Sequence, residues 1–380
     1  MYRIKTLNKI SSAGLDLLDQ TRFQVGGEVE NEDGVLVRSA PMHDYVFPEE
    51  LRAIARAGAG VNNIPLERCS QSGIAVFNTP GANANGVKEL VLAGMLLAAR
   101  DVVGGVEWVR ANQADPDIAK DTEKAKKQFA GGEIQGKRLG IIGLGHIGVK
   151  VANAALALGM EVWAYTLPEG DGTIPGLAEE VHLLEGPDEI YETCDYITLH
   201  LPLNDATRQM IDGAVFARMK PGTVLLNFSR DKLVDDEALA RAMEKGIVRR
   251  YVSDFPNPAV VHLPGALVIP HLGASTEESE DNCACMAVDQ LKAFLEEGTL
   301  RNAVNYPDCT LGTKTDAPRL CVLGENLNAD QLLAGWKTID RADAQKGERC
   351  CLLADLEAEP ATEQLEQLAA QPGVLRVRLI

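Results

Sequence analysis

Three glycines with the spacing G-x-G-x-x-G form the clearest candidate for chemistry in this sequence. Gly143, Gly145 and Gly148 follow an apolar run at 138–142 and precede an apolar helical pattern at 149–158. Between a strand and a helix, the first glycine permits a tight turn, the second lets backbone approach a pyrophosphate, and the third allows close helix–strand packing. Unpaired N–H groups at the start of the helix attract phosphate. The pattern predicts a dinucleotide-binding turn, and glycines that serve packing alone are the less favoured interpretation.

The residue after the next expected strand bears on which dinucleotide binds. That strand is 161–165, and Thr166 follows it where an acidic residue usually holds the ribose. Thr166 can hydrogen-bond a ribose hydroxyl but carries no charge to repel the 2′-phosphate of NADP. No arginine stands between Arg138 and Arg208 to clamp that phosphate. We predict NAD as the cofactor, with NADP left open.

Two residues at expected strand ends are candidates for catalysis. His271 follows the apolar run 266–269 and Pro270, at the carboxyl edge of a parallel sheet where ligands collect, and it is the best acid/base candidate. Arg230 follows the run 223–226 and can hold the carboxylate of a 2-keto acid in two-point fashion. By position alone, a structural role for His271 is equally consistent. For Arg230 the alternative is an edge salt bridge with Asp231 or Asp235.

Other polar residues at strand ends are expected to line the cofactor crevice. His146 lies inside the glycine turn and His200 ends the strand 196–199, so both are predicted to contact cofactor without reacting. Asp254 closes the strand 250–252 and can accept a hydrogen bond from a nicotinamide carboxamide, although alone it resembles a turn or cap residue. The other histidines stand in polar or loop contexts and are expected at the surface: His43, His182 and His262.

Short apolar runs alternate with helical patterns along most of the chain, which is typical of βαβ units and a mainly parallel sheet. Besides the strands above, we expect strands at 34–37 and 74–77, and helices at 48–57, 87–111 and 236–245. After about residue 305 a segment rich in Pro, Asp, Thr and Gly indicates a linker. The remaining pattern is βαββαβ, with strands at 319–323, 336–339, 349–353 and 374–380 and helices at 329–335 and 362–371.

Composition limits the possible functions. The 380 residues carry 37 basic and 55 acidic side chains, a net charge of −18, and no basic cluster, which argues against nucleic acid and anionic membrane surfaces as partners. We expect a cytoplasmic protein with no membrane segment, since no apolar run is long enough and the N-terminus lacks the apolar core of a secretion signal. The eight cysteines lack metal-site spacing, so no metal is predicted and they are interpreted as buried free thiols.

Five segments, in this order, resemble the D-2-hydroxyacid dehydrogenases across nearly the whole chain: 56–64, 77–85, 143–148, 227–230 and 270–276. The resemblance implies a Rossmann-type doubly wound α/β nucleotide domain, a flavodoxin-like discontinuous substrate domain and a C-terminal α+β domain of ACT-like type. The implied boundaries are 1–88 and 279–306 for the substrate domain, 89–278 for the NAD domain, 307–318 for the linker and 319–380 for the ACT-like domain. The chain would return to its substrate domain through a helix such as 289–297.

The resemblance also implies an activity and residue roles. The activity is NAD-dependent oxidation of 3-phospho-D-glycerate to 3-phosphohydroxypyruvate, the entry to serine biosynthesis, by a homodimer or homotetramer. Arg230 would bind and polarise the substrate, and His271 would shuttle the proton. Cofactor contacts are implied at Gly143, Gly145, His146, Ile147, Gly148, Thr166, His200, Phe228, Ser229, Asp254 and Gly273. Substrate contacts are implied at Arg38, Ser39, Ala59, Gly60 and Asn83, with Arg38 and Ser39 meeting the phosphate.

Two departures from the family pattern keep alternatives open. Family members pair the histidine with a glutamate, but the segment 255–260, which includes Pro258, holds no carboxylate. Such a carboxylate favours the charged imidazole and one tautomer, so its absence predicts a weakened or substituted pair. In the ACT-like domain Gly324 replaces the family's histidine, which makes serine feedback doubtful. The alternatives are a dehydrogenase for another D-2-hydroxy acid and a non-catalytic NAD-binding regulator.

Overall fold

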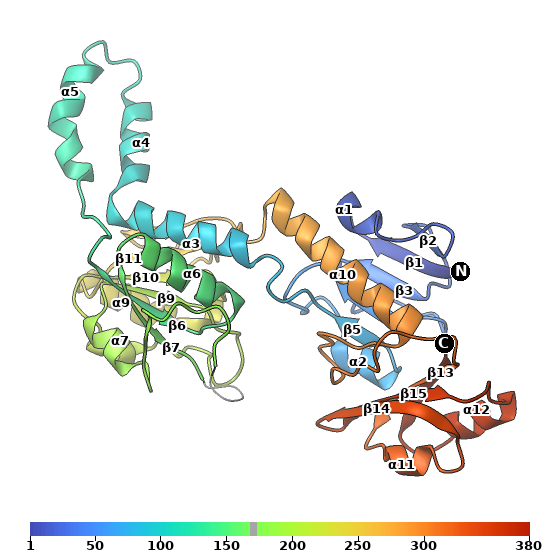
Figure 1. Cartoon of the computed structure of the whole chain (residues 1–380). Coiled ribbons are helices and arrows are strands. Elements are labelled where there is room, and N and C mark those ends of the chain that lie inside the picture. Colours follow the sequence, from blue (N-terminus) through green and yellow to red (C-terminus); the bar gives the residue numbers. More distant parts are fainter. Residues whose placement is uncertain (168–172) are drawn as a thin grey trace. The chain divides into compact units, whose positions relative to one another are not determined.

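A computed structural model of the chain describes residues 1–167 and 173–380, and these form two compact units (Figure 1). One unit comprises 1–83 together with 277–380, and the other comprises 84–276. Both crossings fall directly before a helix, α3 (Ala84–Ala99) and α10 (Glu277–Glu297). The return helix α10 is therefore longer than the expected 289–297. The predicted division into three domains with boundaries at 88/89 and 278/279 stays a prediction.

The first unit is built on a five-stranded parallel sheet in the order β2-β1-β3-β4-β5. This is the flavodoxin-like order, as predicted. Helix α10 and the short α1 (Ser12–Leu15) cover one face, and α2 (Leu66–Gln71) covers the other. The strands are β1 (Tyr2–Leu7), β2 (Phe23–Gly26), β3 (Gly34–Val37), β4 (Ala53–Arg56) and β5 (Ala75–Phe77).

The helix predicted at 48–57 is wrong, because residues 53–56 form strand β4. Ala53, Ile54 and Ala55 are completely buried between β3 and β5. A strand buried on both faces needs no alternation of polar and apolar residues, and tertiary burial here outweighs the helix propensity of alanine. Strands β1 and β2 were not predicted, since in β1 only Ile4 is buried and the apolar signal is weak.

The second unit is built on a seven-stranded parallel sheet in the order β12-β11-β10-β9-β6-β7-β8. Strand order reverses between β6 and β9, as in Rossmann-type doubly wound folds, which confirms the predicted class. Helices α3 and α6 (His146–Ala157) cover one face, and α7 (Asp188–Thr193), α8 (Gly213–Arg218) and α9 (Asp236–Glu244) cover the other. The strands are β6 (Arg138–Ile142), β7 (Glu161–Tyr165), β8 (His182–Leu183), β9 (Tyr196–Leu199), β10 (Thr223–Asn227), β11 (Val248–Ser253) and β12 (Ala266–Val268).

The single helix predicted at 87–111 is two helices, because the chain breaks after α3. The Asp101 side chain accepts a hydrogen bond from the Gly104 N–H at 3.1 Å and so begins α4 (Val102–Ala111). Helix α5 (Ile118–Ala125) and a 3-10 turn, η1 (Lys126–Phe129), run back beside α4, and the pair projects from the sheet of its unit (Figure 1). Neither α4 nor α5 contains a buried residue.

The C-terminal part of the first unit has the predicted βαββαβ order. Its antiparallel sheet has the order β14-β15-β13-β16, and α11 (Ala329–Leu332) and α12 (Thr362–Ala369) cover one face. Strand β14 starts later and runs longer than the expected 336–339. Its side chains are mostly exposed and polar, so no apolar run marks its bounds in the sequence. The strands are β13 (Arg319–Glu325), β14 (Thr338–Lys346), β15 (Arg349–Leu356) and β16 (Val374–Leu379).

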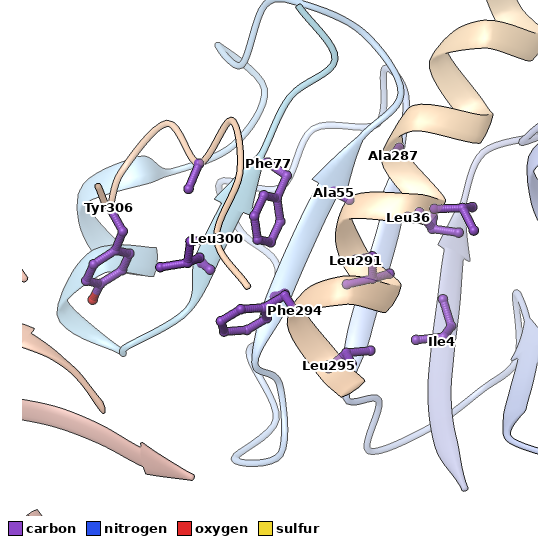
Figure 2. Packing of buried hydrophobic residues seen from close by; sticks show 14 of the residues in the cluster. Ile4, Leu36, Ala55, Phe77, Ala287, Leu291, Phe294, Leu295, Leu300 and Tyr306 are labelled. Atoms are coloured by element: carbon purple, nitrogen blue, oxygen red, sulfur yellow. The ribbon is translucent and has the colours of Figure 1, made fainter. Parts of the chain in front are cut away.

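Helix α10 holds the first unit together. Leu291 and Leu295 lie over Ile4 and Leu36 of the parallel sheet, while Phe294 lies toward Phe77 (Figure 2). The same apolar cluster continues into the C-terminal sheet through four side chains of β13 and β15: Cys321, Leu323, Cys351 and Leu353. The inner strands β13 and β15 are therefore buried on both faces within this unit.

Two features are absent from the described residues. No helix there is long and apolar enough to cross a bilayer. No group of three or more His, Cys, Asp or Glu side chains in the same residues is arranged to hold a metal ion.

Candidate active site

The glycine turn between β6 and α6 has the geometry that its spacing predicts. Gly143 adopts φ 101°, and a Cβ atom there would lie 2.4 Å from the His200 carbonyl oxygen. A Cβ at Gly148 would lie 2.0 Å from the Gly143 carbonyl oxygen. At Gly145 a Cβ would meet nothing within 4 Å, so this side of the turn is open. Gly143 and Gly148 are thus required by packing, whereas Gly145 leaves room for a ligand.

The surroundings of the turn fit a dinucleotide. The turn lies at the point where strand order reverses, beside the first N–H groups of α6. His146 is exposed and Ile147 half-buried in the first turn of that helix, and half-buried Thr166 directly follows β7. The exposed backbone of Gly145 and the helix start would hold the pyrophosphate, and Thr166 lies where a ribose hydroxyl is usually bound.

His200 follows β9 and faces the glycine turn through its backbone. Its Nε2 lies 3.0 Å from the Thr198 hydroxyl, while Nδ1 has no hydrogen-bond partner among the described residues. Burial lowers the pKa of His200 to about 4. The ring is therefore neutral at pH 7 and is unsuited to serve as a general acid.

Phe228 and Ser229 lie at the end of β10, but their side chains are used by the protein itself. The Phe228 ring is buried in the core below α3, and the Ser229 hydroxyl donates a 2.6 Å hydrogen bond to the Leu199 carbonyl. Any contact of these two residues with a cofactor would therefore use the backbone. Sequence reasoning placed them at the crevice without distinguishing side chain from backbone.

Asp254, His271 and Arg230 form the charged part of the site. Asp254 is 1% exposed; one carboxylate oxygen accepts a 3.2 Å hydrogen bond from the Gly273 N–H, and the other has no partner among the described residues. Burial raises the pKa of Asp254, and the nearby charges of His271 and Arg230 oppose that rise. The His271 ring is exposed and lies against Phe255, with ring centroids 4.7 Å apart.

The Arg230 guanidinium is available to a ligand. It donates one hydrogen bond, at 2.6 Å, to the Ser229 carbonyl, and it forms no ion pair with any described residue. The suggested edge salt bridges are absent from this part of the chain, because Asp231 pairs with Lys232 and Asp235 caps α9 by accepting from the Ala238 N–H.

The loop that lacks the family's glutamate is anchored in a different way. The Asn257 amide donates a 2.7 Å hydrogen bond to Asp231, which fastens the loop to the turn between β10 and α9. Pro258 is exposed next to it. No hydrogen bond joins His271 to a carboxylate among the described residues.

The predicted substrate residues lie in the first unit, around the ends of β3 and β4. Arg38 pairs with Glu280 of α10 at 2.8 Å, and the Ser39 N–H donates to the Asn8 side chain at 3.1 Å. Ala59 is held by a 2.7 Å hydrogen bond from the Asn78 amide to its carbonyl. Gly60 and Asn83, both half-buried, complete the predicted set.

Sequence reasoning missed the residues that shape these loops. Arg56 donates through Nε to the Arg38 carbonyl at 2.9 Å and through Nη1 to the Gly60 carbonyl, so it fixes two loops at once. Asn8 adopts φ 76° after β1 and holds the backbone of Ser39 and Ala40. An asparagine directly after a strand is a recognisable signal for such a turn, but β1 itself was not predicted.

Comparison with known proteins gives consistent relatives. Residues 92–273 match the family model "D-isomer specific 2-hydroxyacid dehydrogenase, NAD binding domain". The chain is 34% identical over 301 residues to a D-3-phosphoglycerate dehydrogenase of Methanocaldococcus jannaschii (76% of this chain, 54% of that protein). It is 30% identical over 404 residues to one of Synechocystis (99% and 68%). It is 35% identical over 278 residues to a hydroxypyruvate reductase of Thermotoga maritima (70% and 85%).

A solved structure agrees with these relatives. The NAD+-bound 3-phosphoglycerate dehydrogenase of Entamoeba histolytica matches with a TM-score of 0.63 and 26% identity, covering 80% of this chain and 98% of that one. The chain spans about half the length of the Methanocaldococcus relative. The chain belongs to the D-isomer specific 2-hydroxyacid dehydrogenase family, and residues 92–273 match its NAD-binding domain.

Proposed function

We propose that this protein is an NAD-dependent dehydrogenase that oxidises 3-phospho-D-glycerate to 3-phosphohydroxypyruvate, the first step of serine biosynthesis. The main support is the cluster of Arg230, His271 and Asp254 beside an open glycine turn. This arrangement combines an anion-binding guanidinium, a proton acceptor and a cofactor crevice at one edge of a sheet. The names of the Methanocaldococcus and Synechocystis relatives favour this substrate.

The proposed chemistry assigns one task to each group. Bound NAD supplies the acceptor for hydride from C2 of the substrate. His271 takes the proton of the 2-hydroxyl on its ring and, being exposed, releases it to solvent. Arg230 holds the substrate carboxylate and stabilises charge on the developing carbonyl oxygen. The partnerless oxygen of Asp254 accepts a hydrogen bond from the carboxamide of the nicotinamide.

Arg38 is the proposed phosphate ligand. Its guanidinium is 38% exposed and pairs with a single carboxylate, Glu280, which a phosphate dianion can displace. Ser39 lies on the same loop, where its N–H and that of Ala40 donate to the Asn8 side chain. A phosphorylated substrate therefore gains affinity from Arg38 that an unphosphorylated one does not.

A dehydrogenase for an unphosphorylated 2-hydroxy acid is the second candidate, and the hydroxypyruvate reductase of Thermotoga favours it. The deciding experiment measures NADH formation with 3-phospho-D-glycerate and D-glycerate, in wild type and in Arg38→Met. We expect kcat/KM for the phosphorylated substrate to fall about 100-fold, or about 2.7 kcal/mol, with little change for D-glycerate.

Arg22→Met is the matched control, because Arg22 is also an exposed arginine of the first unit with one ion-pair partner, Glu296. Equal losses on both substrates would remove Arg38 from phosphate binding and favour the second candidate. A lack of turnover on any 2-hydroxy acid, with NAD still bound, would favour the non-catalytic regulator. The same assays with NADP in place of NAD test the cofactor preference that Thr166 leaves open.

We also propose that the protein forms a homodimer through the α4–α5 hairpin. Four valines on α4 are 38–49% exposed, namely Val102, Val103, Val106 and Val109, and all but Val103 border an apolar groove of about 510 Å³. An apolar surface of this kind on a hairpin without buried residues is typical of a protein interface. Light scattering should give the mass of two chains for wild type and of one chain for Val106→Glu, whereas Val46→Glu, at an 86% exposed valine, should leave the dimer intact. A cytoplasmic location stays a prediction from the sequence.

A further inference from the structure

Phe255 follows Asp254 on the loop after β11, and its side chain is set apart from the rest of the fold. The ring is half-buried and belongs to none of the apolar clusters that the described residues form. It lies against the ring of His271, with a centroid distance of 4.7 Å and an interplanar angle of 50°. Core packing therefore does not account for Phe255, whereas contact with the proposed proton acceptor does.

The loop that carries Phe255 is fixed on both sides of the ring. The Phe255 N–H donates to the Ser253 hydroxyl at 3.1 Å, at the end of β11. Two residues further on, the Asn257 amide donates to Asp231 at 2.7 Å. Val260 is 1% exposed and anchors the end of the loop in the core of its unit. These contacts hold the ring in place independently of the histidine that it touches.

The charged groups near His271 do not supply a hydrogen-bonded partner for its imidazole. Asp254 is close enough for its charge to interact with His271, but one of its oxygens accepts from the Gly273 N–H and the other has no partner among the described residues. Burial raises the pKa of Asp254, so this carboxyl group is a weaker anion than an exposed one. Arg230, which also interacts with Asp254, carries the same sign of charge as an imidazolium. The aromatic ring is therefore the group in direct contact with the histidine.

We propose that Phe255 is a positioning residue for the proton transfer: its ring holds the His271 imidazole and stabilises the imidazolium that forms when the proton of the substrate arrives. A cation within about 6 Å of an aromatic centroid is attracted by the negative potential of the ring face. The distance of 4.7 Å lies inside this range. The charge develops only as the proton moves, so the attraction is stronger after the transfer than before it.

An aromatic ring in this position has an advantage over a carboxylate, because it adds no negative charge to a site that is proposed to bind an anionic substrate. This role rests on the proposed function, in which His271 accepts the proton of the 2-hydroxyl. The contact between the two rings, in contrast, can be tested without any substrate.

NMR titration of the His271 ring in the full chain tests this contact independently of activity, and the spectrum of His271→Gln assigns the signal. Phe255→Leu keeps an apolar side chain without the ring, and Phe255→Tyr keeps the ring. We expect the titration midpoint of His271 to fall by about half a pH unit in Phe255→Leu, because the imidazolium loses its aromatic partner. Phe255→Tyr should titrate like wild type.

Kinetic assays with NAD and the 2-hydroxy acid that is turned over test the role in catalysis. Phe255→Leu should lower kcat about threefold to tenfold and leave KM within about twofold, because the ring acts on the histidine and not on the substrate. The acidic limb of its pH–kcat/KM profile should move downward, since the weaker base stays neutral to a lower pH. Phe255→Tyr should restore both quantities.

Phe47→Leu is the matched control. Phe47 is also a half-buried ring beside a cation, with the Arg68 guanidinium 4.2 Å from its centroid, but it lies in the other unit. This variant should leave the titration of His271 and the kinetic constants unchanged.

An unchanged midpoint in Phe255→Leu, or an equal fall in Phe255→Leu and Phe255→Tyr, would overturn the stabilising role of the ring. A lower midpoint together with an unchanged kcat would remove the ring from catalysis. If Asp254→Asn lowers the midpoint and Phe255→Leu does not, the buried carboxyl group is the partner of His271 instead. Turnover of no 2-hydroxy acid would contradict the proposed function, and the titration would still decide whether the two rings interact.

Discussion

Two regions of this protein treat their buried polar atoms differently. At the junction of α10 with the C-terminal sheet, Arg319 is 0% exposed and donates to both oxygens of Asp355 and to two carbonyls. In the cofactor crevice, Asp254 and His200 each retain an atom with no partner among the described residues. Arg378 follows the first pattern, since it donates to the carbonyls of Phe294 and Leu295 at the end of α10.

The difference separates structural polar groups from functional ones. A buried group that is fully paired contributes to packing and orientation, whereas a buried group that is left unpaired costs free energy until a ligand satisfies it. Evolution retains such a cost most readily at a binding site. On this argument the crevice belongs to the functional site, and the Arg319 junction belongs to the scaffold.

The largest expected effect is a loss of stability when the ion pair between Arg319 and Asp355 is removed. Arg319→Leu leaves Asp355 buried without its partner and should lower the free energy of unfolding by about 3–5 kcal/mol. Urea unfolding measures this loss. The double variant Arg319→Leu/Asp355→Leu should recover part of it, because no buried charge remains. NAD affinity should be unchanged in both variants, and a loss of NAD binding by the folded protein would contradict the assignment of this junction to the scaffold.

The second effect is a pH dependence that arises from the crevice. The pKa of His200 is about 4 in the folded protein and about 6.5 when unfolded, so between these values the unfolded chain binds more protons. The stability that depends on the neutral ring is present above pH 6.5 and is lost as the pH falls toward 4, to a total of about 3 kcal/mol.

Comparison of wild type with His200→Gln isolates this contribution from that of the carboxylates. Urea unfolding between pH 7 and pH 4 should show a steeper loss of stability in wild type. Parallel pH profiles for the two proteins would mean that His200 is solvated and not part of a buried crevice.

Some of these structural features can be predicted from the local sequence, and others cannot. The glycine turn was predictable because its spacing is a local signal, and the close contact at Gly148 is with Gly143, five residues earlier; the contact of Gly143 with His200 depends on the fold. The pairing of Arg319 with Asp355 joins strands 36 residues apart and has no signal in either residue's neighbourhood. Likewise Ala53–Arg56 has helix-forming residues, and only burial between β3 and β5 makes it a strand.

The site shows the same limit. That Arg230 and His271 lie near Asp254 was predictable because each follows an apolar strand, and carboxyl ends of parallel strands meet at one edge; their catalytic roles stay predictions. The role of Arg56 was not predictable, because its side chain donates to the carbonyls of Arg38 and Gly60, which only the folded loops bring together. The break between α3 and α4 at Asp101 could in principle have been predicted, because aspartate is a common N-cap. It was missed because the apolar pattern continues on both sides of Asp101.

A smaller effect is expected from Asp254→Asn. Because burial raises the pKa of Asp254, the stability contributed by its neutral form is present at low pH and is lost as the pH rises through the folded-state pKa. The amide carries no charge, so the variant should be more stable than wild type at pH 7 by about 1 kcal/mol and should show no gain at pH 3. NAD binding should weaken at the same time. A variant that loses stability at pH 7 would place Asp254 with the paired scaffold groups.

The smallest effect concerns the missing carboxylate of the site. Pro258 is exposed on the loop after Asp254, so Pro258→Glu can introduce a negative charge without disturbing the core. A carboxylate near an imidazole favours its charged form, and His271 must be neutral to accept the substrate proton. The acidic limb of the pH–kcat/KM profile should therefore move upward by up to about one pH unit. Pro258→Gln controls for the loss of proline. If kcat/KM of Pro258→Glu matches that of Pro258→Gln at every pH, a carboxylate on this loop does not act on His271. The acid–base chemistry of this chain then depends on the crevice groups alone.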